Sequence, residues 1–75
     1  MAKTAAPAKP RQVRHWTIAA DAPAKPVAWL EMPDNTLHPH DSRGDGRRIL
    51  IAGAVYDICD TLDGVPVFRF IHQEG

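Results

Sequence analysis

The sequence predicts an all-β or mostly β protein, built as a small antiparallel open barrel or two-layer sandwich of about four or five strands. Most of the strand-forming side chains fall in residues 47–71, which read RRILIAGAVYDICDTLDGVPVFRFI. Turn-forming residues separate the apolar runs, and no segment keeps a 3.6-residue period between helix caps. The helix content should therefore be low.

The length of the chain sets a second limit. Its 75 residues make one domain at most, and a chain this short buries only roughly 60 % of its unfolded surface. A core of that size leaves no room for a deep catalytic cleft. We expect an extended arm rich in Pro, Ala and Lys over residues 1–10, followed by a single β-rich domain over residues 11–75.

The first ten residues, MAKTAAPAKP, favour an extended or polyproline II backbone because Pro7 and Pro10 are three positions apart. Residues 1–26 carry five basic side chains against one acid, a net charge of +4, and residues 27–75 carry four arginines against eight acids, a net charge of −4. This asymmetry predicts a basic arm on an acidic body. The arm either folds back on its own body or reaches a partner.

Two apolar segments precede the middle of the chain. Residues 12–19 alternate in polarity around Trp16, which predicts a short strand, and the Pro/Ala-rich residues 20–26 predict a linker. Residues 27–32 (VAWLEM) form an apolar run between Pro26 and Pro33, which we interpret as a second strand.

Residues 33–46 (PDNTLHPHDSRGDG) contain so many turn formers that they predict a long exposed loop. Loops of this length are uncommon in compact domains unless they are functional or mobile, so this loop is a candidate binding site. His38 and His40 can present both rings on one side of an extended backbone, but metal sites need three or four ligands, and two exposed turn histidines are the simpler interpretation. The tripeptide that begins at Arg43 spells an adhesion motif, but a three-letter match arises readily by chance, and we favour a simple turn.

The last third of the sequence predicts a strand over residues 47–52, a bend or close backbone approach at Gly53, and a hairpin over residues 55–71. A three-residue loop ending at Gly64 pairs Ile58 with Phe68, Tyr56 with Phe70 and Asp57 with Arg69, whereas a two-residue turn shifts every pair by one. We favour the longer loop because it separates polar from apolar faces. Pro66 cannot donate a ladder hydrogen bond, which predicts a sheet edge at least near the start of the last strand.

No catalytic constellation is predicted. Cys59 is the single cysteine, which excludes an internal disulfide, and its strand context predicts a structural side chain. Asp57, Asp60 and Asp63 scatter over both faces of the hairpin, so they do not form a carboxylate pair. We expect no enzyme activity, no cofactor and no metal.

The sequence favours a non-enzymatic module that docks on a larger protein or assembly. Chains of this size and style are frequent among viral proteins, so a phage head or tail component, or a phage inhibitor of a host protein, is the specific expectation. The alternative is a small nucleic-acid-binding barrel that stacks bases on aromatic rings and uses the basic arm. Self-association of copies stays open. The predicted partner-binding residues are Lys3, Pro7, Lys9, Pro10, Arg11, Arg14, His38, His40 and Arg43.

The sequence contains neither a signal-peptide-like apolar segment at its start nor a span of about 20 apolar residues. We expect a soluble product made in a cytoplasm, with a place in a virion if the assembly hypothesis holds, and no contact with a membrane.

Overall fold

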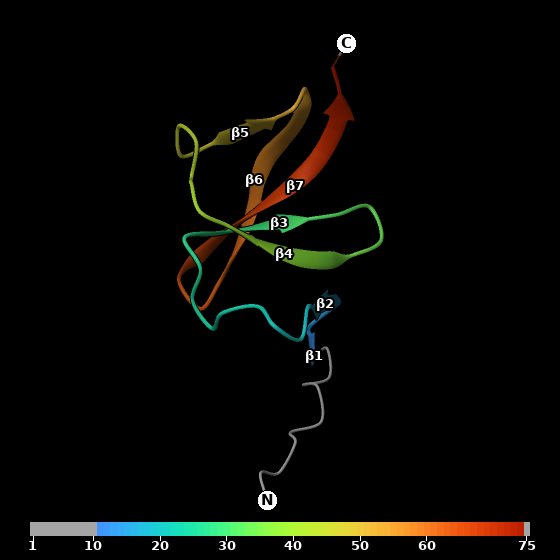
Figure 1. The fold of residues 1–75 in the computed structure, drawn as a ribbon, viewed down its shortest axis with the longest axis vertical. Helices are drawn as coiled ribbons and strands as arrows, with labels where there is room; N and C mark the ends of the chain where they lie inside the picture. The colour runs from blue at the N-terminus through green and yellow to red at the C-terminus, as the bar shows by residue number, and fades with distance from the viewer. Residues whose placement is uncertain (1–10, 75) are drawn as a thin grey trace, which may run out of the picture.

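The computed structural model describes residues 11–74, which form one open, mixed sheet of seven strands without a helix (Figure 1). The order of the strands across the sheet is β1-β2-β4-β3-β7-β6-β5. The strands are β1 (Arg11–Val13), β2 (Trp16–Ile18), β3 (Ala28–Glu31), β4 (Thr36–His40), β5 (Arg48–Ile51), β6 (Ala54–Leu62) and β7 (Val65–Gln73).

The prediction of an all-β fold is confirmed, and its finer form is wrong. The sheet has seven strands instead of four or five, and it is neither an antiparallel barrel nor a sandwich, because β2 runs parallel to β4 and β3 runs parallel to β7. The predicted arm over residues 1–10 lies outside the described residues.

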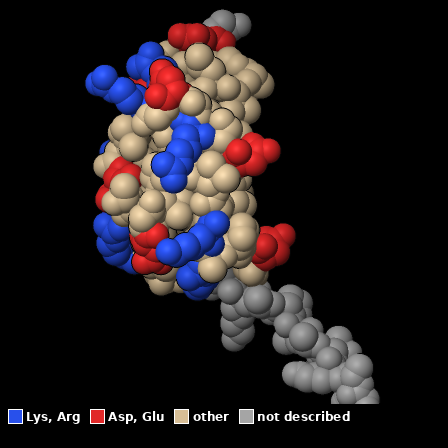
Figure 2. All heavy atoms as spheres, turned by 90° about the vertical axis from the view of Figure 1, so that its left-hand side faces the viewer, with Lys and Arg blue, Asp and Glu red and all other residues tan. Residues whose placement is uncertain are grey.

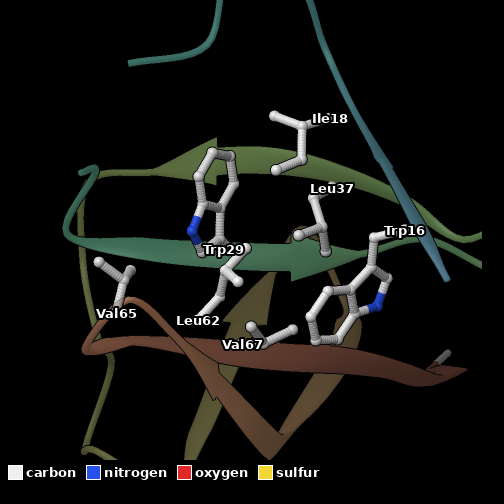
Figure 3. Packing of buried hydrophobic residues seen from close by; sticks show 7 residues of the cluster. All are labelled: Trp16, Ile18, Trp29, Leu37, Leu62, Val65 and Val67. Carbon is white, nitrogen blue, oxygen red and sulfur yellow. The ribbon is translucent and has the colours of Figure 1, made fainter. Parts of the chain in front are cut away.

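Hydrophobic clusters cover opposite faces of the two central strands, β3 and β7. Neighbouring residues on a strand point to opposite faces, so Trp29 joins the first cluster and Leu30 the second. Figure 3 shows the first cluster between β2, β4, β3 and the tip of the β6–β7 hairpin. Its buried members are Trp16, Ile18, Trp29, Leu37, Leu62, Val65 and Val67. The second cluster contains Ala28, Leu30, Ile49, Ala54, Tyr56 and Phe68.

The β6–β7 hairpin combines the two registers that the sequence left open. Its turn has two residues, with φ of 52° at Asp63 and 82° at Gly64, as a type I′ turn requires. The predicted three-residue loop is therefore wrong. A bulge between Ile58 and Asp60 then shifts the pairing by one, because Cys59 is an extra residue on β6. Beyond the bulge the predicted pairs are confirmed: Ile58 with Phe68, Tyr56 with Phe70 and Asp57 with Arg69.

A proline ends the parallel pairing of β2 with β4. The N–H of Thr17 donates to the carbonyl of Asn35 at 3.0 Å, so alternate residues of β4, namely Leu37 and then residue 39, turn their N–H groups toward β2. Pro39 has no N–H, so the ladder stops. The carbonyl of Ala19, which would have accepted that bond, accepts from the N–H of Ala22 at 3.1 Å, and the chain turns away.

Prolines bound the parallel pairing of β3 with β7 in the same way. The register places the backbone groups of Phe68 and Phe70 toward β3, with Glu31 as the last residue of β3 that is paired. The next donor would be Pro33, which has no N–H, and Pro66 cannot donate at the other end. The prediction that Pro66 marks a sheet edge is wrong for β7 as a whole, because β7 lies between β3 and β6. Pairing of β7 with β3 nevertheless starts only after Pro66.

Two further segments differ from their predictions. The strand predicted at residues 12–19 is a hairpin, because Arg14 at φ 55° begins a turn between β1 and β2. The loop predicted at residues 33–46 contains β4, since Leu37 is an apolar side chain that the first cluster buries. By contrast, the predictions for Gly53 are confirmed. Gly53 takes φ 83°, and a Cβ atom on this residue would lie 2.9 Å from the carbonyl oxygen of Glu74, so the chain bends here and the two backbones approach closely.

Candidate protein-binding surface

A row of charged side chains with alternating sign crosses four adjacent strands. Arg48 of β5 is opposite Asp57 of β6, Asp57 is opposite Arg69 of β7, and Arg69 is opposite Glu31 of β3. We call these four residues the charged row. Arg48 binds both carboxylate oxygens of Asp57, at 2.7 and 3.2 Å, and this contact lowers the pKa of Asp57 from its usual value. The predicted pair of Asp57 with Arg69 is confirmed in register only, because each side chain bonds to its other neighbour.

Glu31 is the one acid of the row that is buried, with 4 % of its surface exposed. Its Oε1 accepts from Nε of Arg69 at 2.5 Å, and its Oε2 accepts from Nε1 of Trp16 at 2.5 Å and lies 3.3 Å from Nε2 of His15. Burial raises the pKa of Glu31, but the bonds from Arg69, Trp16 and His15 together outweigh it and leave the pKa below its ordinary value. Glu31 is therefore a carboxylate that fastens the β1–β2 hairpin and β7 to β3.

The neighbouring row on the same face is apolar. Val55 of β6 is opposite Leu50 of β5 and pairs with His72 of β7. Ile71 precedes His72 and is the extra residue of β7 at a second register shift, between Val55 and Tyr56. We call Leu50, Val55 and Ile71 the apolar row. Val55 is 1 % exposed and belongs to neither core cluster, whereas Leu50 is 62 % and Ile71 47 % exposed. This half of the sheet therefore has a core on one face and, on the other, an apolar row in which Val55 is buried while Leu50 and Ile71 are exposed.

The free edge of β5 is protected by the loop that precedes it. The carbonyl of Arg48 accepts from the N–H of Asp45 at 3.3 Å, and the N–H of Arg48 donates to Oδ1 of Asp45 at 2.8 Å. The backbone N–H groups of Arg47 and Arg48 lower the pKa of Asp45. These contacts engage the backbone groups of Arg48 at the edge, whereas those of Leu50, which face the same edge, have no partner within residues 11–74.

The upper edge of β7 is different, because β3 leaves it after Glu31. The register turns the carbonyl of Phe70 toward the gap beyond Pro33, and within residues 11–74 no ladder donor meets it. A depression of about 480 Å³ opens at this point. We call it the notch; it is lined by His15, Glu31, Met32, Pro33, Asn35, Arg69 and Phe70.

The predicted binding residues of the middle segment lie away from both rows. His38 and His40 occupy alternate positions of β4, and so share a face as expected. Within residues 11–74 no three residues of metal-binding type come together. Arg43 is exposed in the loop before β5, where its carbonyl accepts from the N–H of Gly46 at 2.9 Å.

The predicted basic residues near the arm lie at the opposite end of the sheet. Arg11 is exposed on β1. Arg14 is engaged within the molecule: Nη1 bonds to Asp60 at 3.2 Å, Nη2 donates to the carbonyl of Thr61 at 2.8 Å, and the guanidinium lies 4.8 Å from the ring centre of Trp16. Lys3, Pro7, Lys9 and Pro10 lie outside the described residues.

Sequence reasoning missed Glu31, His15 and Asn35 of the notch, and Leu50 and Ile71 of the apolar row. No local signal marks them, because an exposed aliphatic residue on a strand is recognised only when the uncovered face is known. Cys59 was expected to face apolar neighbours, and it is exposed at the bulge instead, where partial burial still raises the pKa of its thiol.

Comparisons with family models, with curated proteins and with solved structures found no match for this chain. Within the described part of the chain, no helix has the length and apolarity to cross a membrane.

Proposed function

We propose that this protein is a non-enzymatic module that docks on a larger protein or assembly, either as a phage head or tail component or as a phage inhibitor of a host protein. The observation that carries the docking proposal is the apolar row. In a chain with so small a core, Leu50 and Ile71 stay exposed near the charged row, on the part of this face that the first cluster does not cover. An apolar centre beside polar side chains is the composition of protein interfaces.

The way the arm is attached supports the same function. Trp16 and Ile18 of β2 are fully buried, and Arg14 and the Glu31 contacts fasten the turn that precedes them. The β1–β2 hairpin, which starts at Arg11, is therefore fixed to the sheet, and a fixed attachment point lowers the entropy that the proposed arm would lose on meeting a partner. The phage assignment rests on size and style alone.

Nucleic-acid binding remains the second candidate, and two observations speak against it. Figure 2 shows Lys and Arg side chains interleaved with Asp and Glu over one face of the molecule, so this face has no continuous basic surface. Of the five rings proposed for base stacking, Trp16, Trp29, Tyr56 and Phe68 are buried in the two clusters, and Phe70 is partly buried. The basic arm is the feature that keeps this candidate open.

Affinity capture from the cells that produce the protein tests the proposal. The wild-type chain should retain a defined protein, and Leu50→Asp should lose it, because a buried unpaired carboxylate disfavours the interface. Val27→Asp is the matched control, since Val27 is also exposed, at 46 %, but lies outside the apolar row. A wild-type chain that retains no protein, or retains the same protein after Leu50→Asp, would contradict the proposal.

Neutralising the basic residues distinguishes nucleic-acid binding from protein docking. Changing Lys3, Lys9, Arg11 and Arg14 to Gln should reduce the slope of log K against log salt by about 0.7–0.9 for each phosphate contact that is lost. The docking proposal expects no such change in capture of the protein partner. Titrations with single- and double-stranded oligonucleotides at two salt concentrations decide between the two functions.

A further inference from the structure

We propose that the notch binds an extended, acidic segment of a partner protein, which adds to the upper edge of β7 as a further strand. This inference rests on the proposed protein-binding function and specifies one point of contact for it. The upper edge of β7 is the stretch from Phe70 to Gln73, past the end of β3. In Figure 1 this part of β7 continues beyond β3, with no strand on that side.

Within residues 11–74, the backbone of β7 has an unpaired acceptor at the notch. Pro33 withholds the donor that the parallel ladder would require at the carbonyl of Phe70, so an acceptor is left at a sheet edge. An extended peptide satisfies such an edge with its own N–H groups, which is the general basis of strand addition. On the competing edge of β5, Asp45 engages the backbone groups of Arg48, and β1 is only three residues long.

The exposed charge in the notch is positive. The exposed ionisable side chains that line the notch are those of Arg69 and His15, while the acid among the lining residues, Glu31, is buried and fully bonded. Nε of Arg69 is held by Glu31, and within residues 11–74 neither terminal nitrogen of Arg69 has a hydrogen-bond partner. Glu31 therefore orients a guanidinium fork whose free donors suit a carboxylate.

The walls of the notch are partly apolar. Met32, Pro33 and Phe70 line it together with the polar side chains, and Phe70 packs edge-on against Tyr56 at 5.7 Å between ring centres. Side chains of an added strand alternate, so one acid is flanked by residues that point the other way. The expected ligand is an alternating segment with a central acid and β-branched neighbours.

The probe is a blocked five-residue peptide of sequence TVEVT, with TVKVT as its charge-reversed partner. Both are titrated to about 1 mM into the full-length, ¹⁵N-labelled protein. TVEVT should shift the amide resonances of residues 70–73, the Nε–H of Arg69 and the indole N–H of Trp16. It should bind about threefold to tenfold more tightly than TVKVT. N-methylation of the peptide backbone should abolish the shifts, because it removes the donors.

Asn35 supplies a pair of variants with little risk to the fold. It lines the notch at φ 68°, a conformation that Asp and Gly also accept. Asn35→Asp should weaken TVEVT severalfold by placing a like charge in the notch, and Asn35→Gly should leave binding close to that of the wild type. Equal binding of TVEVT to both variants would refute the acidic ligand.

Several outcomes overturn the inference. No shift at about 1 mM peptide, shifts centred on β1 or β5, or equal affinity for the two peptides would each do so. If the same resonances move with protein concentration alone, the occupant is a second copy and the partner segment is wrong. Leu50→Asp should still bind TVEVT. A wild-type chain that captures its protein but does not bind TVEVT refutes the notch, and a wild-type chain that captures no protein refutes the docking function.

Discussion

Glu31 shows how one buried carboxylate determines the position of three segments. Its partners are 15, 16 and 38 positions away in sequence, and together they connect the β1–β2 turn, β3 and β7. Replacing one carboxylate oxygen by an amide NH₂ group would leave either the Nε–H of Arg69 or the indole N–H of Trp16 without its acceptor. Unsatisfied donors in this environment cost more than the bonds contribute net.

Glu31→Gln should lower the free energy of unfolding at neutral pH by about 1–3 kcal/mol. The pKa of Glu31 in the fold lies below its unfolded value, so its stabilisation is present above the unfolded pKa of about 4.3 and is lost as the pH falls through the folded pKa. The difference between wild type and variant should therefore shrink on acidification from pH 5. Denaturant unfolding over a pH series measures it.

Three other carboxyl groups also have a lowered pKa, namely those of Asp34, Asp45 and Asp57. They destabilise both proteins equally in acid, so the difference between the curves isolates Glu31. A constant difference from neutral to acid pH would mean that the pKa of Glu31 is the same in the folded and unfolded states.

At the scale of strands, the sequence predicts where strands form better than it predicts their neighbours. Residues 27–32 and 47–71 contain the strands expected of them, because β-branched and aromatic residues between turn formers are a local signal. The parallel pairs join segments far apart in sequence, such as Leu30 with Phe68, and no local signal specifies them. The bulge at Cys59 is likewise invisible in sequence, because both registers of the hairpin are locally acceptable.

Pro39→Ala tests the role of proline in ending the β2–β4 ladder. The substitution restores an N–H on the side that faces the carbonyl of Ala19, so we expect the ladder to extend by one bond and the turn at Ala22 to loosen. The new amide at residue 39 should exchange with solvent at least about tenfold more slowly than an exposed amide. Hydrogen exchange followed by NMR measures this, with the amide of Asp41 as the exposed reference. Fast exchange at residue 39 would show that some other constraint ends the ladder.

At the scale of the whole molecule, β3 and β7 contribute to both hydrophobic clusters, so the clusters should unfold together. Both tryptophans belong to the first cluster, and Ile49 belongs to the second, on β5. Ile49→Ala should cost about 2–5 kcal/mol through the lost contacts and the cavity. We expect the tryptophan fluorescence to report the full shift, although Ile49 lies outside its cluster.

The measurement compares the denaturant midpoint from tryptophan fluorescence with the midpoint from far-UV circular dichroism. Coincident midpoints in both proteins indicate one cooperative unit. A fluorescence midpoint that stays at the wild-type value while the circular dichroism midpoint falls would show two independently stable halves. The candidate surface could not be predicted at this scale either, because which half of each face is uncovered depends on how the whole sheet curves.

Because β3 is buried on both faces, its register in the sheet depends on side-chain size more than on polarity. A strand with one wet face resists a one-residue slip because the slip exposes its apolar side chains. All four residues of β3 are buried, so polarity supplies little of that resistance. Bulk supplies it instead: a slip would drive the indole of Trp29 into the space shaped for Ala28 and Leu30, and would leave a void where the indole had been. The alignment of this sheet is thus encoded in the sizes of neighbouring side chains.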